Sequence, residues 1–221
     1  MRAATFPEKL TDCTHCPRLA GFLSDVRQQH PAYHARPVEP FGDPQARLLI
    51  VGLAPGLHGA NRTGRPFTGD HAGILLYQTL HRFGFASRGE SVALDDGLEL
   101  IDCRITNAVK CLPPQNKPEP AEIRDCNHYL TTELEHSPEV RVILALGGIA
   151  HKAVLMALDL KQSAFIFRHG GRHALPKLGN AARVLIDSYH CSRYNTQTRR
   201  LTAESFATVF AAIRAELERV A

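Results

Sequence analysis

Four cysteines stand in two pairs whose types and spacing suit metal binding. Cys13 and Cys16 form a C-x-x-C pair in TDCTHCP, and Cys111 and Cys126 form a second, wider pair in KCLPPQNKPEPAEIRDC. Four thiolates arranged in this way suit a tetrahedral zinc ion or an iron–sulfur cluster, and the spacing alone does not choose between the two. The alternative is a redox-active C-x-x-C pair, with the remaining cysteines filling the core.

A second candidate is the polar, glycine-rich segment Val51–Gly73, VGLAPGLHGANRTGRPFTGDHAG. Long loops in compact domains are usually functional, which favours a binding role for this one. It lacks the G-x-G-x-x-G pattern, so we disfavour a dinucleotide-binding Rossmann enzyme. Asp70 is the only acid in the segment, and it also stands directly before a helical pattern, where Asp is a preferred N-cap.

Three further features could contribute to a site. Asn107 and His190 each follow an apolar run, although a strand-end Asn is often a turn former and His190 could be an ordinary surface histidine. The segment 168–200 holds seven Arg or Lys residues and a single acid, Asp187, which favours a phosphate-bearing partner over a merely solvated face.

The elements that position these residues alternate along the chain. Short apolar runs predict four buried strands, at Arg47–Leu53, Ile101–Val109, Val140–Gly148 and Arg183–His190. Helical spacing predicts five helices, at Pro17–Gln29, His71–Phe85, Pro118–His136, Ile149–Leu158 and Ser205–Ala221. We interpret His30–Gln45 as a connector and Ser87–Leu100 as a linker without a clear pattern.

This alternation predicts an α/β protein with a central four-stranded parallel sheet between two layers of helices. The chain of 221 residues suits one domain, residues 1–221, with its N-terminal segment tied to the core by the metal. Ligands of such sheets bind at the carboxyl ends of the strands. Because the glycine-rich segment, Asn107 and His190 all follow strands, we expect them to share one site.

The composition excludes a membrane span and is compatible with a nucleic-acid partner. No apolar run approaches the length of about 20 residues that crosses a bilayer, and the formal net charge is +4. The N-terminus lacks the apolar centre of a secretory signal, so we expect a cytoplasmic protein, in which structural disulfides are rare. We also expect a monomer.

Taken together, the motifs resemble the iron–sulfur branch of the uracil-DNA glycosylase superfamily, and its family 5 more closely than its family 4. The resemblance covers most of the chain and rests on CTHC, GLAPGLHGANRTGRPFTGD, ITNAVKCLPP, Cys126 and HCSRYNTQTRRLT. Family 4 keeps an acid directly after the first glycine of the loop motif, where this chain has Leu53. Cys191 stands where the family usually has proline.

The resemblance implies a DNA glycosylase of base-excision repair that removes uracil and related damaged bases from DNA. It also implies a 4Fe-4S cluster on Cys13, Cys16, Cys111 and Cys126. Such an enzyme flips the base out of the stack and stabilises the charges that separate as the glycosidic bond breaks. Because no step needs an electron, we interpret the cluster as structural. The alternative is a non-catalytic, zinc-stabilised nucleic-acid-binding module.

The resemblance also assigns roles to single residues. Phe67 would stack the flipped base, Asn107 would read its edge, and His190 would donate a hydrogen bond to uracil O2. Asp70 would position water or stabilise the sugar cation, although Phe67 could instead plug the core and Asp70 could simply cap its helix. The first loop would shape the site through Gly52, Ala54, Gly56 and His58. DNA contacts are expected from Lys110, Ser192, Arg193, Tyr194, Asn195, Arg199 and Arg200.

Overall fold

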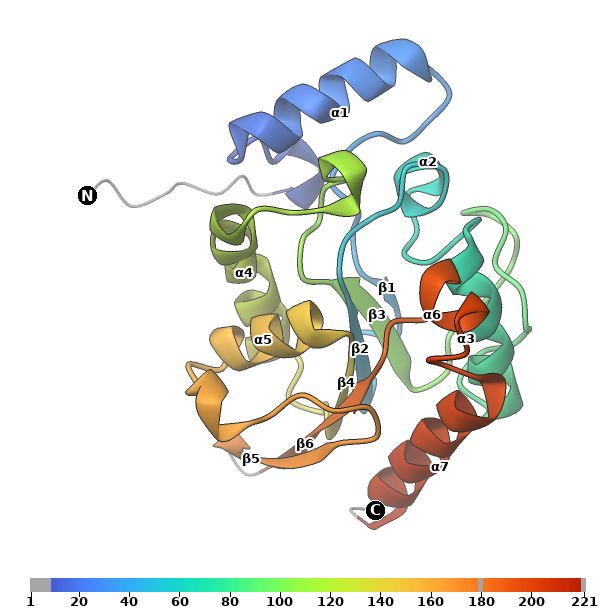
Figure 1. Cartoon of the computed structure of the whole chain (residues 1–221), viewed down its shortest axis with the longest axis vertical. Helices are drawn as coiled ribbons and strands as arrows, with labels where there is room; N and C mark the ends of the chain where they lie inside the picture. The colour runs from blue at the N-terminus through green and yellow to red at the C-terminus, as the bar shows by residue number, and fades with distance from the viewer. Residues whose placement is uncertain (1–8, 179–180, 220–221) are drawn as a thin grey trace.

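The fold is built on one twisted sheet with helices on both faces, as the computed structural model shows for residues 9–178 and 181–219 (Figure 1). In spatial order the strands are β1 (Phe41–Gly42), β3 (Cys103–Asn107), β2 (Leu48–Gly52), β4 (Val142–Leu146), β6 (Ala181–Ser188) and β5 (Arg172–Leu178). The four central strands run parallel and are the four that the sequence predicts. The predicted three-layer α/β/α fold is therefore confirmed.

Two edge strands extend the sheet beyond the prediction. β1 and β5 pair antiparallel with β3 and β6, respectively. β1 lies within the predicted connector and has only two residues, too few to produce a pattern. β5 carries His, Arg and Pro, and these residues suit an edge strand but interrupt the apolar run by which a strand is recognised.

The helices that the sequence predicts are all present, and two short ones are added. The described helices are α1 (Pro17–Gln29), α2 (Ala60–Thr63), α3 (His71–Arg82), α4 (Pro120–Glu135), α5 (Gly148–Ala157), α6 (Arg193–Gln197) and α7 (Ala203–Arg219), with 3-10 turns at Leu10–Asp12, Pro114–Asn116 and Gln162–Ala164. The last two residues of the predicted closing helix lie outside the described residues. Among those described, no helix is both long enough and apolar enough to span a bilayer.

Alternate residues of each parallel strand pack into two separate cores. Leu48 and Ile50 of β2 face α3 and α7, whereas Leu49 and Val51 face α4 and α5. These strands are apolar on both faces because helices cover both, as expected for a parallel sheet. A third, smaller cluster joins α1 to the segment after β3 and to α4. α1 therefore sits beyond the strand ends, near the loops that could form a site (Figure 1).

Candidate active site

The carboxyl ends of β2, β3 and β6 open into one cavity of about 420 Å³, which we call the candidate pocket. This volume lies within the range of about 300–1,000 Å³ typical of small-molecule sites. Eight of the predicted site residues line it together: Ala54, Gly56, Phe67, Asp70, Asn107, His190, Ser192 and Arg193. Ala54 and Arg193, 139 positions apart in the sequence, thus meet at one place, because parallel strands bring their carboxyl ends to the same edge.

Phe67 forms a wall of the candidate pocket and is held in an unusual backbone conformation. Its φ is 55°, in the left-handed region that residues other than glycine seldom adopt. Its ring packs beside the ring of His190, with centroids 5.8 Å apart and planes 29° apart. Such strain in a non-glycine residue is maintained by the surrounding structure and is common at functional sites.

Gly52 allows Phe67 and Asn107 to approach the end of β2. A Cβ atom at Gly52 would lie 2.4 Å from Asn107 Oδ1 and 2.6 Å from Phe67 Cζ, closer than atoms pack. Asn107 is 3% exposed, and its Oδ1 has no hydrogen-bond partner within the described chain. Since the described protein supplies no donor to this oxygen, a ligand that donates a hydrogen bond can satisfy it.

The two carboxylate oxygens of Asp70 have different surroundings. Its Oδ1 accepts a hydrogen bond from the backbone N–H of Gly73 at 2.9 Å and so caps α3. Its Oδ2 lies against the backbone of Gly59, where a Cβ atom would approach it to 2.3 Å. Burial raises the pKa of Asp70, and the N–H groups at the start of α3 oppose this shift. The cap role and an acid in the candidate pocket are therefore compatible.

His190 lines the candidate pocket beside Phe67, two residues after the end of β6. Its backbone carbonyl accepts a hydrogen bond from the Asn195 side chain at 2.8 Å, and Ser192 caps α6 directly after it. The turn therefore forms without the proline that Cys191 replaces, and Cys191 is buried behind it. Desolvation lowers the pKa of His190 to about 4, so its ring is neutral at pH 7 and carries one N–H to donate.

The His190 shift predicts a pH dependence of stability. The folded pKa of about 4 lies below the unfolded value near 6.5, so between these limits the unfolded chain binds a proton that the folded protein does not. The His190 contribution to stability is thus present above pH about 6.5 and is lost as the pH falls towards 4. We expect the melting temperature of His190→Gln to fall less than that of the wild type over this window. Parallel melting curves against pH would contradict the assignment.

The four predicted metal-ligand cysteines also converge, at the start of α1. Cys13, Cys16, Cys111 and Cys126 line one small cavity between α1, the segment after β3, and α4. We call this group the cysteine site. Burial, together with the neighbouring sulfurs and acids, raises the pKa of the Cys16 thiol to about 12. Burial likewise raises the pKa of Cys126 to about 11, although Lys110 opposes this shift. Thiolates crowded in this way are stabilised by a bound cation.

Comparison with known proteins decides the family. The model of the uracil DNA glycosylase superfamily matches residues 39–214. The type-5 uracil-DNA glycosylase of Thermus thermophilus is 50% identical over 214 residues, which cover 95% of each chain. The type-5 enzyme of Pyrobaculum aerophilum is 43% identical, covering 92% of this chain and 88% of its own.

The chain belongs to the uracil-DNA glycosylase superfamily. A type-4 uracil-DNA glycosylase from Sulfurisphaera tokodaii is 30% identical, over 76% of this chain and 70% of its own. The higher identities to type-5 proteins agree with the Leu53 position in the loop motif, and the predicted resemblance to family 5 is confirmed.

Two residues that line the candidate pocket, Asn116 and His71, were not predicted from the sequence. Asn116 lines the candidate pocket from the 3-10 turn Pro114–Asn116, with a φ of 57°. A signal was present, because Asn tolerates left-handed backbone and PPQN is typical turn chemistry. His71 was also missed. It lines the candidate pocket and contacts Thr196 Oγ1 at 2.9 Å, which joins α3 to α6.

The predicted DNA contacts fall into two groups. Arg193, Tyr194, Arg199 and Arg200 are exposed on α6 and the turn after it, and their contacts with DNA stay predictions. Lys110 is a correction: it is 1% exposed, and its ammonium contacts Thr106 Oγ1 and Glu133 Oε1, each at 2.5 Å. Its side chain turns back into the protein towards α4, where an ion pair compensates the buried charge, so it cannot reach a phosphate.

The basic segment 168–200 is likewise only partly available to a partner. Arg172 forms an ion pair with Glu216 of α7 at 2.8 Å, and Arg183 is buried and donates to the carbonyl of Ser137 at 2.9 Å. These two cations therefore serve the fold. The exposed cations described in the segment include those around α6, next to the candidate pocket.

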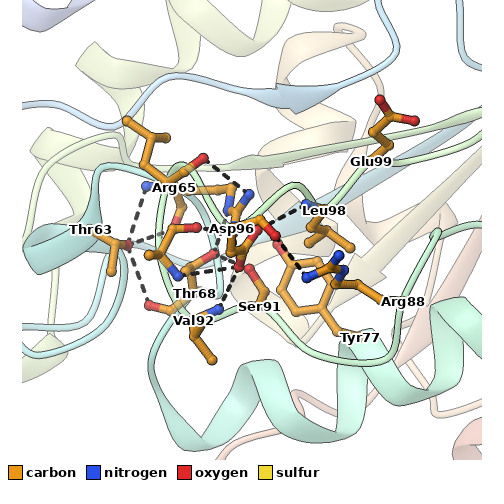
Figure 2. A network of polar contacts seen from close by, with 12 residues as sticks. Thr63, Arg65, Thr68, Tyr77, Arg88, Ser91, Val92, Asp96, Leu98 and Glu99 are labelled. Carbon is orange, nitrogen blue, oxygen red and sulfur yellow. Dashed lines mark hydrogen bonds and ion pairs between the residues drawn. The ribbon is translucent and has the colours of Figure 1, made fainter.

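A buried ion pair fixes the glycine-rich loop beside Phe67. Arg65 is 1% exposed and contacts the Asp96 carboxylate at 2.6 Å, as Figure 2 shows. Asp96 also accepts hydrogen bonds from the backbone N–H groups of Val92 and Leu98. Burial alone would raise the pKa of Asp96, but Arg65 and these N–H groups outweigh it and hold the pKa well below its usual range. The predicted linker Ser87–Leu100 is thus locked onto the loop that carries Phe67 and Asp70.

We expect Asp96→Asn to destabilise the protein by about 3 kcal/mol, since it leaves the Arg65 guanidinium buried without a counter-charge. The measurement is thermal unfolding, and the loss corresponds to about 6–12 °C in a chain of this size. The matched control is Asp102→Asn, which breaks the partly exposed pair with Arg47 and should cost about 1 kcal/mol or less. An equal fall in melting temperature for the two variants would show that the buried Arg65–Asp96 pair stabilises the fold no more than the partly exposed Arg47–Asp102 pair.

Proposed function

We propose that this protein is a DNA glycosylase that hydrolyses the N-glycosidic bond of deoxyuridine in DNA and initiates base-excision repair. The observation that carries the proposal is the convergence of Phe67, Asp70, Asn107 and His190 on the candidate pocket. Type-5 uracil-DNA glycosylases that match nearly the whole chain support it. The pocket offers a flat aromatic wall, a hydrogen-bonding edge, a carboxylate and a neutral N–H donor.

Recognition of the base comes first. The flipped base lies against the Phe67 ring, since base–aromatic stacking contributes about 1–3 kcal/mol for any base. Asn107 then selects among bases by its free amide oxygen, which accepts the N3–H of uracil, while its amide nitrogen donates to O4. Cytosine has no hydrogen on N3 and presents an amino group at C4, so it mismatches both atoms.

Bond cleavage uses two polar groups of the candidate pocket, the Asp70 carboxylate and the His190 ring. As the C1′–N1 bond breaks, its electron pair passes to the base, and the neutral His190 N–H stabilises the anion at O2. The Asp70 carboxylate stabilises the cationic sugar and orients a water molecule whose oxygen bonds to C1′. The water loses a proton to Asp70 or solvent, and the released base takes up a proton. The products are an abasic site and free uracil.

We infer that the cysteine site holds a 4Fe-4S cluster. Its four thiols line one small cavity, and four thiolates are the ligand set of such a cluster. When bound, the cluster supplies four covalent links that join α1 to the β3 segment and α4.

The test of the activity is a nicking assay with the purified protein on duplexes that carry one deoxyuridine, followed by alkali. We expect abasic sites at uracil and none at thymine, with no strand break before the alkali step. Duplexes with hypoxanthine, xanthine and 5-hydroxymethyluracil measure the breadth of the pocket. Complete inactivity on uracil would overturn the proposal and favour a binding module without catalysis.

A further inference from the structure

Three aromatic rings form a cluster beside the candidate pocket, and of these only His58 is among the predicted site residues. The rings of His30 and Tyr33 stack with centroids 4.5 Å apart and planes 14° apart. The His58 ring meets both edge-on, at 6.0 Å and 6.1 Å. The Tyr33 hydroxyl and His58 Nδ1 share a hydrogen bond of 2.9 Å. We call these three residues the aromatic cluster.

The aromatic cluster joins segments that are distant in sequence. His30 ends α1, Tyr33 lies in the connector after it, and His58 belongs to the glycine-rich loop. The connector is fastened to α2 by two backbone hydrogen bonds, from His34 N to Arg62 O and from Ala35 N to Asn61 O. Figure 1 shows this chain segment passing from α1 towards α2.

One member of the aromatic cluster, His58, links it to the surroundings of the candidate pocket. His58 lines an adjoining cavity of about 700 Å³ that lies on the same side of the molecule. The two cavities share several lining residues, namely Gly56, Asp70, His71, Asn116 and Arg193. A strand that places one nucleotide in the candidate pocket therefore runs past the adjoining cavity with its next nucleotides.

The chemistry of the rim suits a nucleic-acid strand. His58 is exposed, and Arg62, one turn along α2, is exposed as well and donates from Nε to the His58 carbonyl at 2.8 Å. Arg62 makes no ion pair with any residue in the part of the chain that the structure describes. His58 is the exposed ring of the aromatic cluster, and His30 and Tyr33 are half-buried behind it. Aromatic rings stack on bases and Arg contacts phosphate, so an exposed ring beside a guanidinium without an ion pair suits a single strand of nucleic acid.

The contact between the connector and α2 does not depend on the side chains of His58 and Arg62. The backbone bonds from His34 and Ala35 already fasten the connector to α2, and Tyr33 packs against the small core under α1. The exposed His58 ring and the Arg62 side chain add nothing to that core. His58 instead lines the cavity that adjoins the candidate pocket, and Arg62 lies next to it on α2.

We propose that the aromatic cluster and Arg62 bind the DNA strand that carries the flipped nucleotide, on one side of it only. The surface holds the flanking nucleotides by stacking and phosphate contact, while the turn at α6 lies across the candidate pocket. This inference rests on the proposed glycosylase function for the position of the strand. The partner chemistry is single-stranded or locally opened DNA.

The experiment measures the Kd of labelled single strands of about 20 nucleotides with a central 2′-fluoro-2′-deoxyuridine, which resists cleavage. Two shorter strands keep only two nucleotides on the 5′ side or only two on the 3′ side. We expect the double variant Tyr33→Leu/His58→Ala to raise the Kd of the long strand about tenfold. One truncated strand should show the same loss and the other none.

Matched variants separate binding from folding. His136→Ala, an exposed histidine at the end of α4, should leave every Kd unchanged. If the double variant melts at a lower temperature than the wild type, His58→Ala/Arg62→Gln replaces it, because both of these side chains are exposed. A Kd within twofold of the wild type on the long strand, in a variant with normal melting, would overturn the inference.

The failure of this inference is distinguishable from failure of the proposed function. The wild-type nicking assay on uracil tests the function by itself. An all-thymidine strand of the same length tests the surface without any target base, and the variant should lose affinity for it as well. Loss of affinity on both sides of the target nucleotide would contradict the one-sided placement.

Discussion

Asp70→Asn should lower the single-turnover rate of uracil release by about 10³-fold while leaving the protein folded. Asn keeps an oxygen for the Gly73 N–H and is as good an N-cap as Asp, so α3 retains its start. What is lost is the negative charge beside the developing sugar cation. The measurement is a rapid-quench time course with enzyme in excess over uracil-containing duplex.

The pH profile gives the Asp70 prediction a second readout. Since the folded pKa of Asp70 is raised by burial, the wild-type rate should fall on acidification at a pH above the ordinary range for an aspartate. This limb should disappear in Asp70→Asn. A raised carboxyl pKa also means that the ionised form destabilises the fold, so the variant should melt at the same temperature or higher at pH 7.

Asp70→Ala supplies the matched control for the cap. It removes both the charge and the N-cap, so it should be as slow as Asp70→Asn but less stable by about 1 kcal/mol. If Asp70→Asn released uracil at the wild-type rate, Asp70 would be a helix cap alone. The catalytic carboxylate would then have to be sought elsewhere around the candidate pocket.

If the cysteine site holds the proposed 4Fe-4S cluster, Cys13→Ser should remove the absorbance near 400 nm together with the iron, and destabilise the protein by about 5 kcal/mol or more. In a chain of this size that corresponds to a fall of about 10–20 °C in the melting temperature. The physical reason is that the cysteine site joins α1 to the segment after β3, and without the cluster that contact depends on one small apolar core.

Cys103→Ala is the control for the cysteine site. Cys103 is buried in β3 and lies outside the cysteine site, so this variant should keep its iron and its colour. Elemental analysis decides between metals. A colourless wild-type protein with one zinc would contradict the 4Fe-4S proposal, and a colourless but stable and fully active Cys13→Ser would contradict the structural role.

The parallel strands could be predicted because each is a continuous apolar run, and the long helices because their apolar residues recur at helical spacing. Leu48–Gly52 is apolar throughout, and α3 shows an uninterrupted helical spacing. β1 and α6 were missed because two and five residues cannot establish a period, and their conformations depend on their neighbours: β1 pairs with β3, and Ser192 caps α6.

The candidate pocket was predictable in its members but not in its details. Asn107 and His190 follow strands, and their meeting is a consequence of parallel topology. The direction of a long side chain does not follow from topology. The Lys110 ammonium points inwards because Glu133, twenty-three positions later, lies beside it in the fold. The partner of Arg65 was equally hidden, since Asp96 is thirty-one positions away in a linker without any pattern.

Because the described protein supplies no donor to Asn107 Oδ1, the melting temperature of the protein should depend on which free base is added. The described protein supplies no donor to this buried acceptor, and a hydrogen bond from a ligand to such an atom contributes about 0.5–1.5 kcal/mol. A free base with a hydrogen on N3, such as uracil, can donate that hydrogen to Asn107 Oδ1. Cytosine has a lone pair on N3 instead, which repels the lone pairs of this oxygen. The melting temperature of the protein should therefore rise with free uracil and stay unchanged with cytosine, so that thermal shift alone ranks bases by the hydrogens they carry.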